Sequence, residues 1–541
     1  MHQMQKDIEN GFIPFSEERA RFYLEKGCWQ NQTLFQMLEE SGQKYADQIA
    51  VRQDQKSLTY QELYDYAAKY GTYLAKKGLK EGDFVLIQSP NVIEFFVVLF
   101  GLTFIGARPV FCLNGHGAHE IENIARKSRA VGYIRIVDRH QHHDEVIDMT
   151  NQFIQPNLNL WYRQTIANGH TLQDSFPALK NLSIDFNQQS QAKATDIAFL
   201  QLSGGTTGLP KLIARTHTDY LYSVRLSADV AHLDQHSKQL IVLPVMHNFT
   251  MSSPGFLGAF YAGATVILTQ DSSAKNCFSL IEKYKITQVS LVPALINLWI
   301  NSGKQDNYDL SSLKVIQIGG AKLLPVLANE ILEKLNITIQ QVYGMAEGLV
   351  NFTHLDDDVN TIVYTQGKKL SEYDEIKILD DDGFALKRNA AGFILTRGPY
   401  TINGYYNSAE DNKKSFTLDG FYITGDIGFI DDNGNIVVTG RAKEQINRAG
   451  EKITPSELEN LILEFNGVKD VCVIGIEDKI LGEKIKVLII SEHADRIFSL
   501  REIRKFLQEK RIAEYKLPDE VENVSEFKYT HVGKIHKQKL K

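Results

Sequence analysis

The sequence predicts an α/β protein with a large N-terminal domain and a small C-terminal domain. The chain of 541 residues exceeds the size at which a single hydrophobic core stops growing, so we expect more than one domain. Short apolar runs alternate with amphipathic stretches in the first half, a pattern typical of strands covered by helices. Turn signals between β-like runs become denser after residue 370, which predicts a β-rich subdomain inside the large domain.

The strands of the large domain are predicted by short apolar runs that end in or beside glycine or proline. Such runs occupy residues 197–202, 240–245, 289–295 and 315–321. Ligands in α/β sheets tend to bind at the carboxyl ends of strands, and the motifs described below follow these runs. The longest apolar stretch, residues 95–107, is too short to span a bilayer, so we expect a buried helix there.

The β-rich part and the C-terminal domain are marked by turns and by a charged stretch. Residues 380–383 and 431–435 predict hairpin turns. Residues 440–452 are charged and lack apolar periodicity, which predicts a linker or a mobile loop. Residues 455–465 are expected to form a helix, with Thr454 as N-cap and Pro455 at its first position. Two apolar runs and a second helix near residues 500–511 complete a domain of roughly a hundred residues.

Composition excludes several broad classes. A net charge of −7 argues against a general nucleic-acid binder. The four cysteines, Cys28, Cys112, Cys277 and Cys472, form no CxxC pair, so we expect no disulfide framework or structural zinc site, and a reducing compartment fits. The N-terminal residues lack the apolar run of a signal peptide. We therefore expect a cytoplasmic protein that binds neither nucleic acid nor membrane.

Residues 203–211, with the sequence SGGTTGLPK, predict a loop that wraps a phosphate. Its glycines let backbone N–H groups turn toward one anion, its hydroxyl side chains add donors, and Lys211 adds a mobile positive charge. The loop does not fit the Walker template, because Pro210 precedes the lysine and Leu212 follows it where Ser or Thr would bind magnesium. The alternative is a flexible surface turn. The candidate phosphate-binding residues are Ser203, Gly204, Gly205, Thr206, Thr207, Gly208 and Lys211.

Two further motifs carry groups suited to a nucleotide. In YGMAEG, which starts at Tyr343, the ring could stack on a purine and Glu347 could hold a magnesium ion through oxygen. In YITGD, which ends at Asp426, the carboxylate is a natural acceptor for two ribose hydroxyls, and Arg441 could assist it. Each has an ordinary alternative: a turn before a helix for the first, and a turn aspartate with a solvated arginine for the second.

The segment MHNFTMSSPG, residues 246–255, carries groups that suit an aromatic acid. Asn248 can donate its amide to a carboxylate or a ring hydroxyl, and Phe249 can flank an aromatic ring. Ser253 before Pro254 also has the pattern of a helix N-cap followed by proline at the first helical position. Both roles are compatible, because a capping serine sits at a helix end where ligands bind.

The last candidate is Lys534 in THVGKIHK, where a preceding glycine would let a loop place the ammonium group in a cleft; a lysine near a C-terminus is normally just solvated. Taken singly these motifs are common, but their order and separations resemble the adenylate-forming superfamily of acyl-CoA ligases, luciferases and non-ribosomal peptide adenylation domains. The resemblance extends from Leu58 to Lys534. The runs around Ser203, Asn248 and Tyr343 are most similar to the stand-alone aryl-acid ligases of siderophore synthesis.

The resemblance implies the adenylate-forming fold and an activation of an aryl acid by ATP and Mg²⁺, giving aryl-AMP and pyrophosphate. Lys211 and its loop would hold the β- and γ-phosphates, and Glu347 would hold Mg²⁺. Asp426, helped by Arg441, would bind the ribose hydroxyls, and Lys534 would bridge the carboxylate and the α-phosphate in the transition state. The residues implied to frame adenine are Gly319, Gly320, Tyr343 and Gly344.

A second half-reaction is implied as well, in which the phosphopantetheine thiol of an aryl carrier protein attacks aryl-AMP. Members of the superfamily achieve it by rotating the C-terminal domain about a hinge, here expected at Lys443. Rotation would withdraw Lys534 and bring the loop of Lys452 toward the cleft. The sequence shows no carrier serine motif, so the carrier protein is expected in trans. The expected division is an adenylation core of residues 1–440, a hinge of residues 441–443 and a lid domain of residues 444–541.

For the aryl ring, the resemblance favours 2,3-dihydroxybenzoate, with salicylate second. Relatives that use salicylate tend to carry cysteine at the Ser253 position and a bulkier aliphatic residue at Val350. Phe249 replaces a tyrosine of several dihydroxybenzoate ligases, which keeps salicylate as a candidate. Asn248 would meet the 2-hydroxyl and Ser253 would lie near the 3-hydroxyl. The implied ring-binding residues are His247, Asn248, Phe249, Ser253, Ala321, Val342, Ala346 and Val350.

Two alternatives are left open by the residues. An aryl- or acyl-CoA ligase would use the same first half-reaction and would differ in its thiol acceptor. A non-catalytic protein that binds ATP or an aryl acid is disfavoured, because the lysines, glutamate and aspartate expected to act in catalysis are all present.

Overall fold

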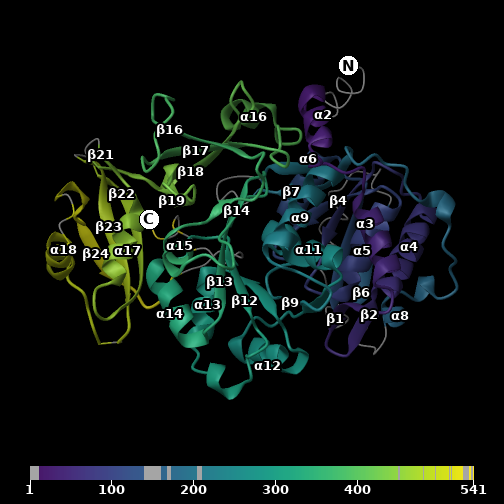
Figure 1. Cartoon of the computed structure of the whole chain (residues 1–541), viewed down its shortest axis with the longest axis horizontal. Helices are drawn as coiled ribbons and strands as arrows, with labels where there is room; N and C mark the ends of the chain where they lie inside the picture. Colours follow the sequence, from purple (N-terminus) through teal and green to yellow (C-terminus); the bar gives the residue numbers. More distant parts are fainter. Residues whose placement is uncertain are drawn as a thin grey trace.

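The computed structural model describes residues 11–138, 160–166, 172–203, 210–448, 451–478, 481–493, 495–510, 512, 514–527, 535, 537 and 540 (Figure 1). Within these residues the strands form four sheets. In Figure 1 the two large sheets fill the middle and right of the molecule, a small sheet lies above them, and the sheet of the C-terminal part lies at the left.

The first large sheet has six strands in the order β6-β5-β3-β4-β7-β8. All neighbours are parallel except β7 and β8, which pair antiparallel on either side of the Gly-rich loop. The predicted strand at residues 197–202 is confirmed, since it forms β7. The strands are β3 (Phe84–Gln88), β4 (Arg108–Cys112), β5 (Gly132–Asp138), β6 (Leu160–Ile166), β7 (Ile197–Leu202) and β8 (Leu212–Thr216).

The second large sheet has nine strands in the order β15-β14-β13-β12-β11-β9-β10-β1-β2. Its central strands are parallel, so their carboxyl ends share one edge, and the predicted runs at 240–245, 289–295 and 315–321 contribute β9, β11 and β12. The strands are β1 (Ile49–Gln53), β2 (Lys56–Thr59), β9 (Lys238–Ile241), β10 (Thr265–Leu268), β11 (Gln288–Leu291), β12 (Val315–Gly319), β13 (Thr338–Gly344), β14 (Val350–Phe352) and β15 (Lys368–Lys369).

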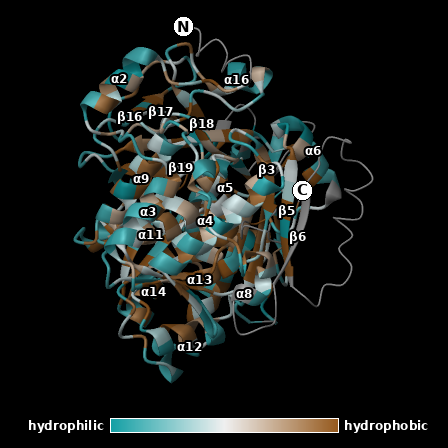
Figure 2. Ribbon diagram, turned by 90° about the vertical axis from the view of Figure 1, so that its right-hand side faces the viewer, coloured by the Kyte–Doolittle hydropathy of each residue, from teal (hydrophilic) through white to brown (hydrophobic). Residues whose placement is uncertain are grey.

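Helices cover both large sheets. All residues of α5 (Ile93–Phe104) are buried, which confirms the predicted buried helix; a helix that is apolar on every side must be enclosed by other elements. The hydrophobic colour in Figure 2 gathers on strands in the interior, and the hydrophilic colour on outer turns and loops. The other helices of this part are α2 (Glu17–Glu25), α3 (Leu34–Lys44), α4 (Tyr60–Lys76), α6 (Ala118–Ser128), α8 (Leu172–Ser175), α9 (His217–Val230), α12 (Ala274–Tyr284), α13 (Pro293–Ile300), α14 (Pro325–Leu335) and α15 (Val359–Tyr364).

The predicted β-rich subdomain is a four-stranded antiparallel sheet, β16-β17-β18-β19. The turns expected at 380–383 and 431–435 lie after β16 and between β18 and β19. Gly383 and Gly434 both have φ near +85°, a conformation that side chains with a Cβ rarely adopt. The elements are β16 (Glu375–Leu379), β17 (Gly392–Arg397), α16 (Ala409–Ser415), β18 (Tyr422–Ile430) and β19 (Ile436–Arg441).

The C-terminal part has its own sheet and its own hydrophobic core. The expected loop at 440–452 is wrong in its described part: it holds the end of β19, a 3₁₀ turn at Ala442–Glu444 and two short strands that pair with each other. Pro455 begins α17 as predicted, and the Thr454 side chain makes no capping hydrogen bond. The elements are β20 (Ile446–Arg448), β21 (Glu451–Ile453), α17 (Pro455–Leu463), β22 (Val468–Asp478), β23 (Gly482–Ser491), α18 (Leu500–Glu509) and β24 (Glu520–Asn523).

Residues 246–255 fold as two short helices, α10 (Asn248–Ser252) and α11 (Gly255–Ala262), which corrects the cap predicted at Ser253. Ser253 ends α10, and Pro254 stands at the N-cap of α11. The displacement by one residue follows from Gly255, whose φ of +59° makes the bend; a Cβ there would lie 2.3 Å from the Thr250 carbonyl oxygen. No helix among the described residues is long and apolar enough to cross a membrane, and the four cysteines are buried and unpaired.

Candidate functional site

Several of the predicted site residues lie where the carboxyl ends of β12 and β13 approach the β7–β8 hairpin and the β16–β19 sheet. β12 ends at Gly319 and β13 at Gly344, so both predicted motifs leave the sheet at one edge. Hydrogen bonds described below join this edge to β18. The order of elements along the chain would not show this convergence, because the partners lie in distant segments, as Tyr343 and Asp426 do.

The ends of the Gly-rich loop are fastened to each other. The Ser203 N–H donates to the Lys211 carbonyl oxygen at 2.9 Å, and the Lys211 N–H donates to Ser203 Oγ at 3.0 Å. Leu202 and Leu212 are opposite each other in the β7–β8 ladder. The loop therefore begins and ends at one antiparallel strand pair, β7 and β8. The predictions for Gly204, Gly205, Thr206, Thr207 and Gly208 lie outside the described residues.

The Lys211 ammonium group lies against three side chains that the sequence motifs did not include. Its Nζ is 4.5 Å from the centroid of the Tyr405 ring, 3.4 Å from Ser415 Oγ and 3.6 Å from Asp411 Oδ1. Ser415 and Asp411 lie on α16, and Tyr405 shortly precedes it. About a third of the lysine side chain is exposed. The charge is thus held at the surface of the site by an aromatic face and a carboxylate.

The Glu347 carboxylate is buried and accepts a hydrogen bond. The Tyr405 hydroxyl donates to Glu347 Oε1 at 2.9 Å, and the Tyr422 hydroxyl lies 3.0 Å from that of Tyr405. Burial raises the pKa of both phenols far above the ordinary value, and the negative Glu347 raises it further. Both phenols therefore stay protonated and serve as donors.

The chemistry around Glu347 fits a magnesium ion that is held mainly by a ligand. Among the described residues no group of three or more His, Cys, Asp or Glu side chains is placed to hold a metal ion. Glu347 supplies one buried carboxylate whose only hydrogen-bond donor in the described part of the chain is Tyr405. Mg²⁺ commonly takes one or two carboxylates and completes its shell with phosphate oxygens and water. The donor set suits that arrangement and would not hold the ion alone.

Tyr343, Asp426 and Arg441 form one linked group. The Tyr343 hydroxyl donates to Asp426 Oδ2 at 2.7 Å, and Arg441 Nε lies 2.8 Å from Asp426 Oδ1. Asp426 and Arg441 are opposite each other in the β18–β19 ladder, which sets their contact. Asp426 is buried, and an unpartnered carboxylate there would be costly. Burial, followed by the negative Asp426, raises the pKa of Tyr343 well above its usual value, so the phenol remains a donor.

A compact apolar wall lies beside Gly319. Phe249, Val342 and Val350 belong to one buried cluster. A Cβ on Gly319 would lie 2.7 Å from the Val342 carbonyl oxygen and 3.1 Å from Phe249 Cζ, so only glycine fits between them. Gly344 is close-packed as well, since a Cβ there would lie 3.1 Å from the Leu349 carbonyl oxygen. The structure thus brings together Phe249, Val342 and Val350, predicted for the aryl ring, with Gly319 and Gly344, predicted for adenine.

The Asn248 side chain has a defined orientation. The Tyr220 hydroxyl donates to Asn248 Oδ1 at 2.9 Å, which leaves the Nδ2 amide group as a donor; none of the described residues accepts from it. Burial raises the pKa of Tyr220 to about 12, so its hydroxyl keeps its proton. His247 caps α10, because its Nδ1 accepts from the Phe249 N–H at 3.4 Å. Tyr220 carried no motif signal in the sequence.

Ala346 and Ala321 lie apart from the apolar wall. Ala346 packs with Tyr405 and Tyr422, and its carbonyl oxygen accepts from Arg215 Nη1 at 2.9 Å. Arg215 is fully buried and also donates from Nη2 to the Tyr400 carbonyl oxygen at 3.1 Å, so it fastens the loop after β13 to the β-rich subdomain. Ala321 is exposed.

The residues predicted for the mobile lid are only partly described. Lys534 lies outside the described residues. Lys443 lies in the 3₁₀ turn after β19, and Lys452 lies in β21 opposite Asn447; their side chains are not among those described. Nearby, Lys537 Nζ lies 3.1 Å from Glu444 Oε2 and 3.1 Å from Glu459 Oε1, so the C-terminal segment is tied to the turn that holds Lys443.

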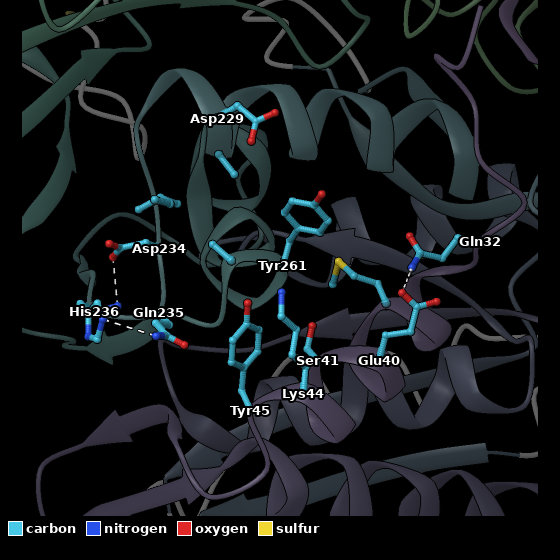
Figure 3. A pocket seen from close by; sticks show the side chains of 14 residues that line it. Gln32, Glu40, Ser41, Lys44, Tyr45, Asp229, Asp234, Gln235, His236 and Tyr261 are labelled. Atoms are coloured by element: carbon cyan, nitrogen blue, oxygen red, sulfur yellow. Dashed lines mark hydrogen bonds between the residues drawn. The ribbon is translucent and has the colours of Figure 1, made fainter.

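A cavity of about 650 Å³ lies elsewhere, between α3, the end of α9 and α11 (Figure 3). The side chains of Tyr45, Tyr261 and Lys44 point into it, with Glu40 and Asp229 at its margins. None of the predicted site residues within the described part of the chain lines it. The cavity is therefore separate from the site described above.

Comparisons with known proteins place these features in a family. The model for AMP-binding enzymes matches residues 38–406, and the model for the C-terminal domain of AMP-binding enzymes matches residues 457–534. A 2,3-dihydroxybenzoate-AMP ligase of Bacillus subtilis is 42% identical over 98% of this chain and 97% of its own length. A salicyl-AMP ligase / salicyl-S-ArCP synthetase of Mycobacterium tuberculosis is 37% identical over 98% and 94%. The apo structure of MbtA from Mycobacterium smegmatis has a TM-score of 0.74 at 36% identity, covering 99% of both chains.

Proposed function

The chain belongs to the AMP-binding enzyme family, and we propose that it activates an aryl acid with ATP to give aryl-AMP and pyrophosphate. It then transfers the aryl group to the phosphopantetheine thiol of an aryl carrier protein that is supplied in trans. One observation supports the proposal: Tyr405 contacts both Lys211 and Glu347, and its neighbour Tyr422 lies on β18, the strand that carries Asp426. Siderophore synthesis is the setting in which such an activity would serve.

In the first half-reaction the aryl carboxylate attacks the α-phosphorus in line, and pyrophosphate leaves. Positioning and charge neutralisation carry this type of displacement. Lys211 and the Gly-rich loop bind the β- and γ-phosphates, and Lys534 bridges the carboxylate and the α-phosphate. Glu347 would hold Mg²⁺, which when bound neutralises phosphate charge. The ammonium of Lys211 is already turned toward the Glu347 side of the site through its contact with Tyr405.

The nucleoside is bound at the carboxyl ends of β12 and β13. Asp426 accepts from the ribose hydroxyls, and Arg441 assists it. The Tyr343 ring stacks on adenine, while its hydroxyl stays on Asp426. The base lies along Gly319, Gly320 and Gly344; a side chain would be strained at Gly320, whose φ is +77°, and would be crowded at the other two.

The aryl ring lies against Phe249, Val342 and Val350. Asn248 donates from Nδ2 to the 2-hydroxyl or the carboxylate, since Tyr220 occupies its Oδ1. The buried Ser253 hydroxyl, which bonds to none of the described residues, meets the 3-hydroxyl of 2,3-dihydroxybenzoate. Phe249 offers no polar group, so salicylate is the second substrate. His247, Ala321 and Ala346 line the margins of the slot.

In the second half-reaction the C-terminal part turns about Lys443. The proposed division is a core of residues 1–440, a hinge of residues 441–443 and a lid of residues 444–541. Rotation withdraws Lys534 and brings Lys452 toward the cleft, which opens a path for the thiol. The separate hydrophobic core of the lid and its separate sheet suit motion as one body.

The test is pyrophosphate–ATP exchange with a panel of benzoic acids, followed by transfer to a phosphopantetheinylated aryl carrier protein or to coenzyme A. We expect exchange with 2,3-dihydroxybenzoate, weaker exchange with salicylate, and transfer to the carrier protein. The absence of exchange with every aryl acid would refute the proposed activity and favour a binding protein. Transfer to coenzyme A at the rate of carrier loading would instead identify an aryl-CoA ligase.

A further inference from the structure

We propose that Tyr405 is a positioning residue that fixes Lys211 and Glu347 relative to each other, so that the leaving-group lysine and the magnesium carboxylate are set by one side chain. The proposal rests on the proposed function for the roles of those two residues. Its physical basis is that one tyrosine contacts both: the ring face meets the lysine ammonium at 4.5 Å, and the hydroxyl donates to the carboxylate at 2.9 Å.

The backbone of Tyr405 is held in place by one side chain. Its N–H donates to Asn412 Oδ1 at 2.7 Å, and Asn412 Nδ2 donates to its carbonyl oxygen at 3.0 Å. Asn412 lies on α16, the helix that also carries two of the groups near Lys211. The amide thus clamps both polar backbone groups of Tyr405. The position of the Tyr405 backbone is therefore fixed by these two hydrogen bonds.

The ring and hydroxyl of Tyr405 are fixed as well. The ring packs edge-on against Phe416 at 5.9 Å and against Tyr422 at 6.3 Å between centroids. Tyr405 is 2% exposed. Because the Tyr405 hydroxyl donates to Glu347, the Tyr422 hydroxyl at 3.0 Å supplies the proton in the bond between the two phenols. The two hydrogen bonds therefore have the same direction: Tyr422 donates to Tyr405, and Tyr405 donates to the carboxylate. In such a chain each hydrogen bond strengthens the next.

These contacts serve two charges of opposite sign through two different parts of one residue. The electron-rich ring face attracts the ammonium, and the positive end of the O–H bond attracts the carboxylate. Removing only the hydroxyl should disturb Glu347 and leave Lys211 in place. Removing the ring should disturb both. A residue that merely filled space would not separate the two effects in this way.

The experiment measures ATP binding by calorimetry, without aryl acid, over a series of Mg²⁺ concentrations and in EDTA. A hydrogen bond to a charged group is worth about tenfold or more in an equilibrium constant. We expect Tyr405→Phe to raise, about tenfold, the Mg²⁺ concentration at which the magnesium-dependent gain in ATP affinity is half complete. ATP affinity without magnesium should stay within about twofold of wild type. Tyr405→Leu should also weaken magnesium-free ATP binding about fivefold, since the cation–π contact is lost.

Tyr406→Phe is the matched control, because it removes the neighbouring buried phenol, which packs on Phe84 at 5.3 Å between centroids. We expect wild-type values for it. An unchanged Mg²⁺ requirement in Tyr405→Phe, or an equal shift in Tyr406→Phe, would overturn the proposal. Unchanged magnesium-free ATP binding in Tyr405→Leu would overturn the link to Lys211.

Two further arms keep the test decisive. If Tyr405→Phe does not fold, Tyr422→Phe removes only the donor behind Tyr405; a rise of about threefold in the Mg²⁺ requirement supports the proposal, and no rise overturns it. Pyrophosphate–ATP exchange separates this proposal from the proposed function. If the Tyr405 variants show the expected changes in Mg²⁺ requirement and ATP affinity but the wild type shows no exchange with any aryl acid, the activity alone is refuted. If the wild type shows exchange but the variants show no such changes, the role of Tyr405 alone is refuted.

Discussion

Gly319→Ala tests the geometry that separates the nucleotide from the aryl slot. The new Cβ would lie 2.7 Å from the Val342 carbonyl oxygen and 3.1 Å from Phe249 Cζ. The carbonyl belongs to the β12–β13 ladder and has little freedom to move, so the new Cβ must move away from it toward the Phe249 ring, and the ring must then give way. Overpacking of this kind costs about 1–3 kcal/mol. If the Phe249 ring moves to relieve the strain, the enzyme should bind the aryl acid less well, because the acid is proposed to lie against that ring.

The assay compares steady-state constants with stability. We expect kcat/KM for 2,3-dihydroxybenzoate to fall about fivefold to 150-fold, which corresponds to 1–3 kcal/mol, with KM for ATP changed less than about threefold. Gly42→Ala is the control, because its Cβ would meet only ordinary contacts, at 3.6 Å from Tyr64 Cβ, and its helix would gain from alanine. If KM for ATP changed more than kcat/KM for 2,3-dihydroxybenzoate, the reasoning would be refuted, and Gly319 would be assigned to adenine binding alone.

Three further outcomes are expected. Burial raises the pKa of Asp374 to about 7, so this carboxyl stabilises the fold fully below the unfolded value near 4 and loses that effect as the pH rises through 7. Asp374→Asn should therefore gain melting temperature relative to wild type between pH 4 and pH 8, and parallel melting curves across that range would contradict this. Tyr220→Phe frees the Asn248 amide to rotate and should lower kcat/KM about tenfold for acids with a 2-hydroxyl but less for benzoate; an unchanged ratio of the two would show that the hydrogen bond does not set specificity. Lys534→Ala should reduce adenylation at least a hundredfold, since its charge meets the transition state, with ATP binding by calorimetry almost unchanged; normal exchange would remove the catalytic role.

The strands were predictable where burial alone defines them. The residues of β7 form a continuous apolar run because the strand is covered on both faces, and its predicted and observed bounds agree. The pair β20 and β21 was not predictable, since both strands are short and charged and exist through pairing with each other and, for Arg448, with Gly482 on β23. Pairing between distant segments leaves no local pattern. The cap at Ser253 failed for a related reason, because the positive φ of Gly255 moved the helix start.

Site residues that belong to a sequence motif could be predicted. Site residues whose importance comes from packing contacts could not. Asp426 and Arg441 were chosen for their charges, and the β18–β19 register brings them together. Tyr405 gave no signal, because its importance arises from contacts with Lys211 and Glu347, which lie in two other segments of the chain. Arg215 was missed for the same reason. A buried arginine is recognised only when the carbonyl groups that it binds are known.

The position of Lys211 explains why the loop departs from the Walker template. In a P-loop the lysine opens a helix, and the helix N-terminus adds positive potential. Here the residues after Lys211 form β8, and α9 begins only at His217. Burial lowers the pKa of His217 to about 3, and its Nδ1 accepts from the Leu34 N–H at 3.1 Å, so it is neutral and adds no charge.

In the proposed function the loop and Lys211 bind the phosphates with no helix N-terminus behind the lysine; in the structure, Lys211 lies against the partly exposed Asp411 and the ring of Tyr405. A partly exposed ion pair is worth at most about 1 kcal/mol, less than a charge-assisted bond to phosphate. Arrival of ATP should thus exchange the carboxylate for phosphate while the ring contact persists. We therefore expect Lys211 to clamp the phosphates by changing its anionic partner while keeping its contact with the Tyr405 ring.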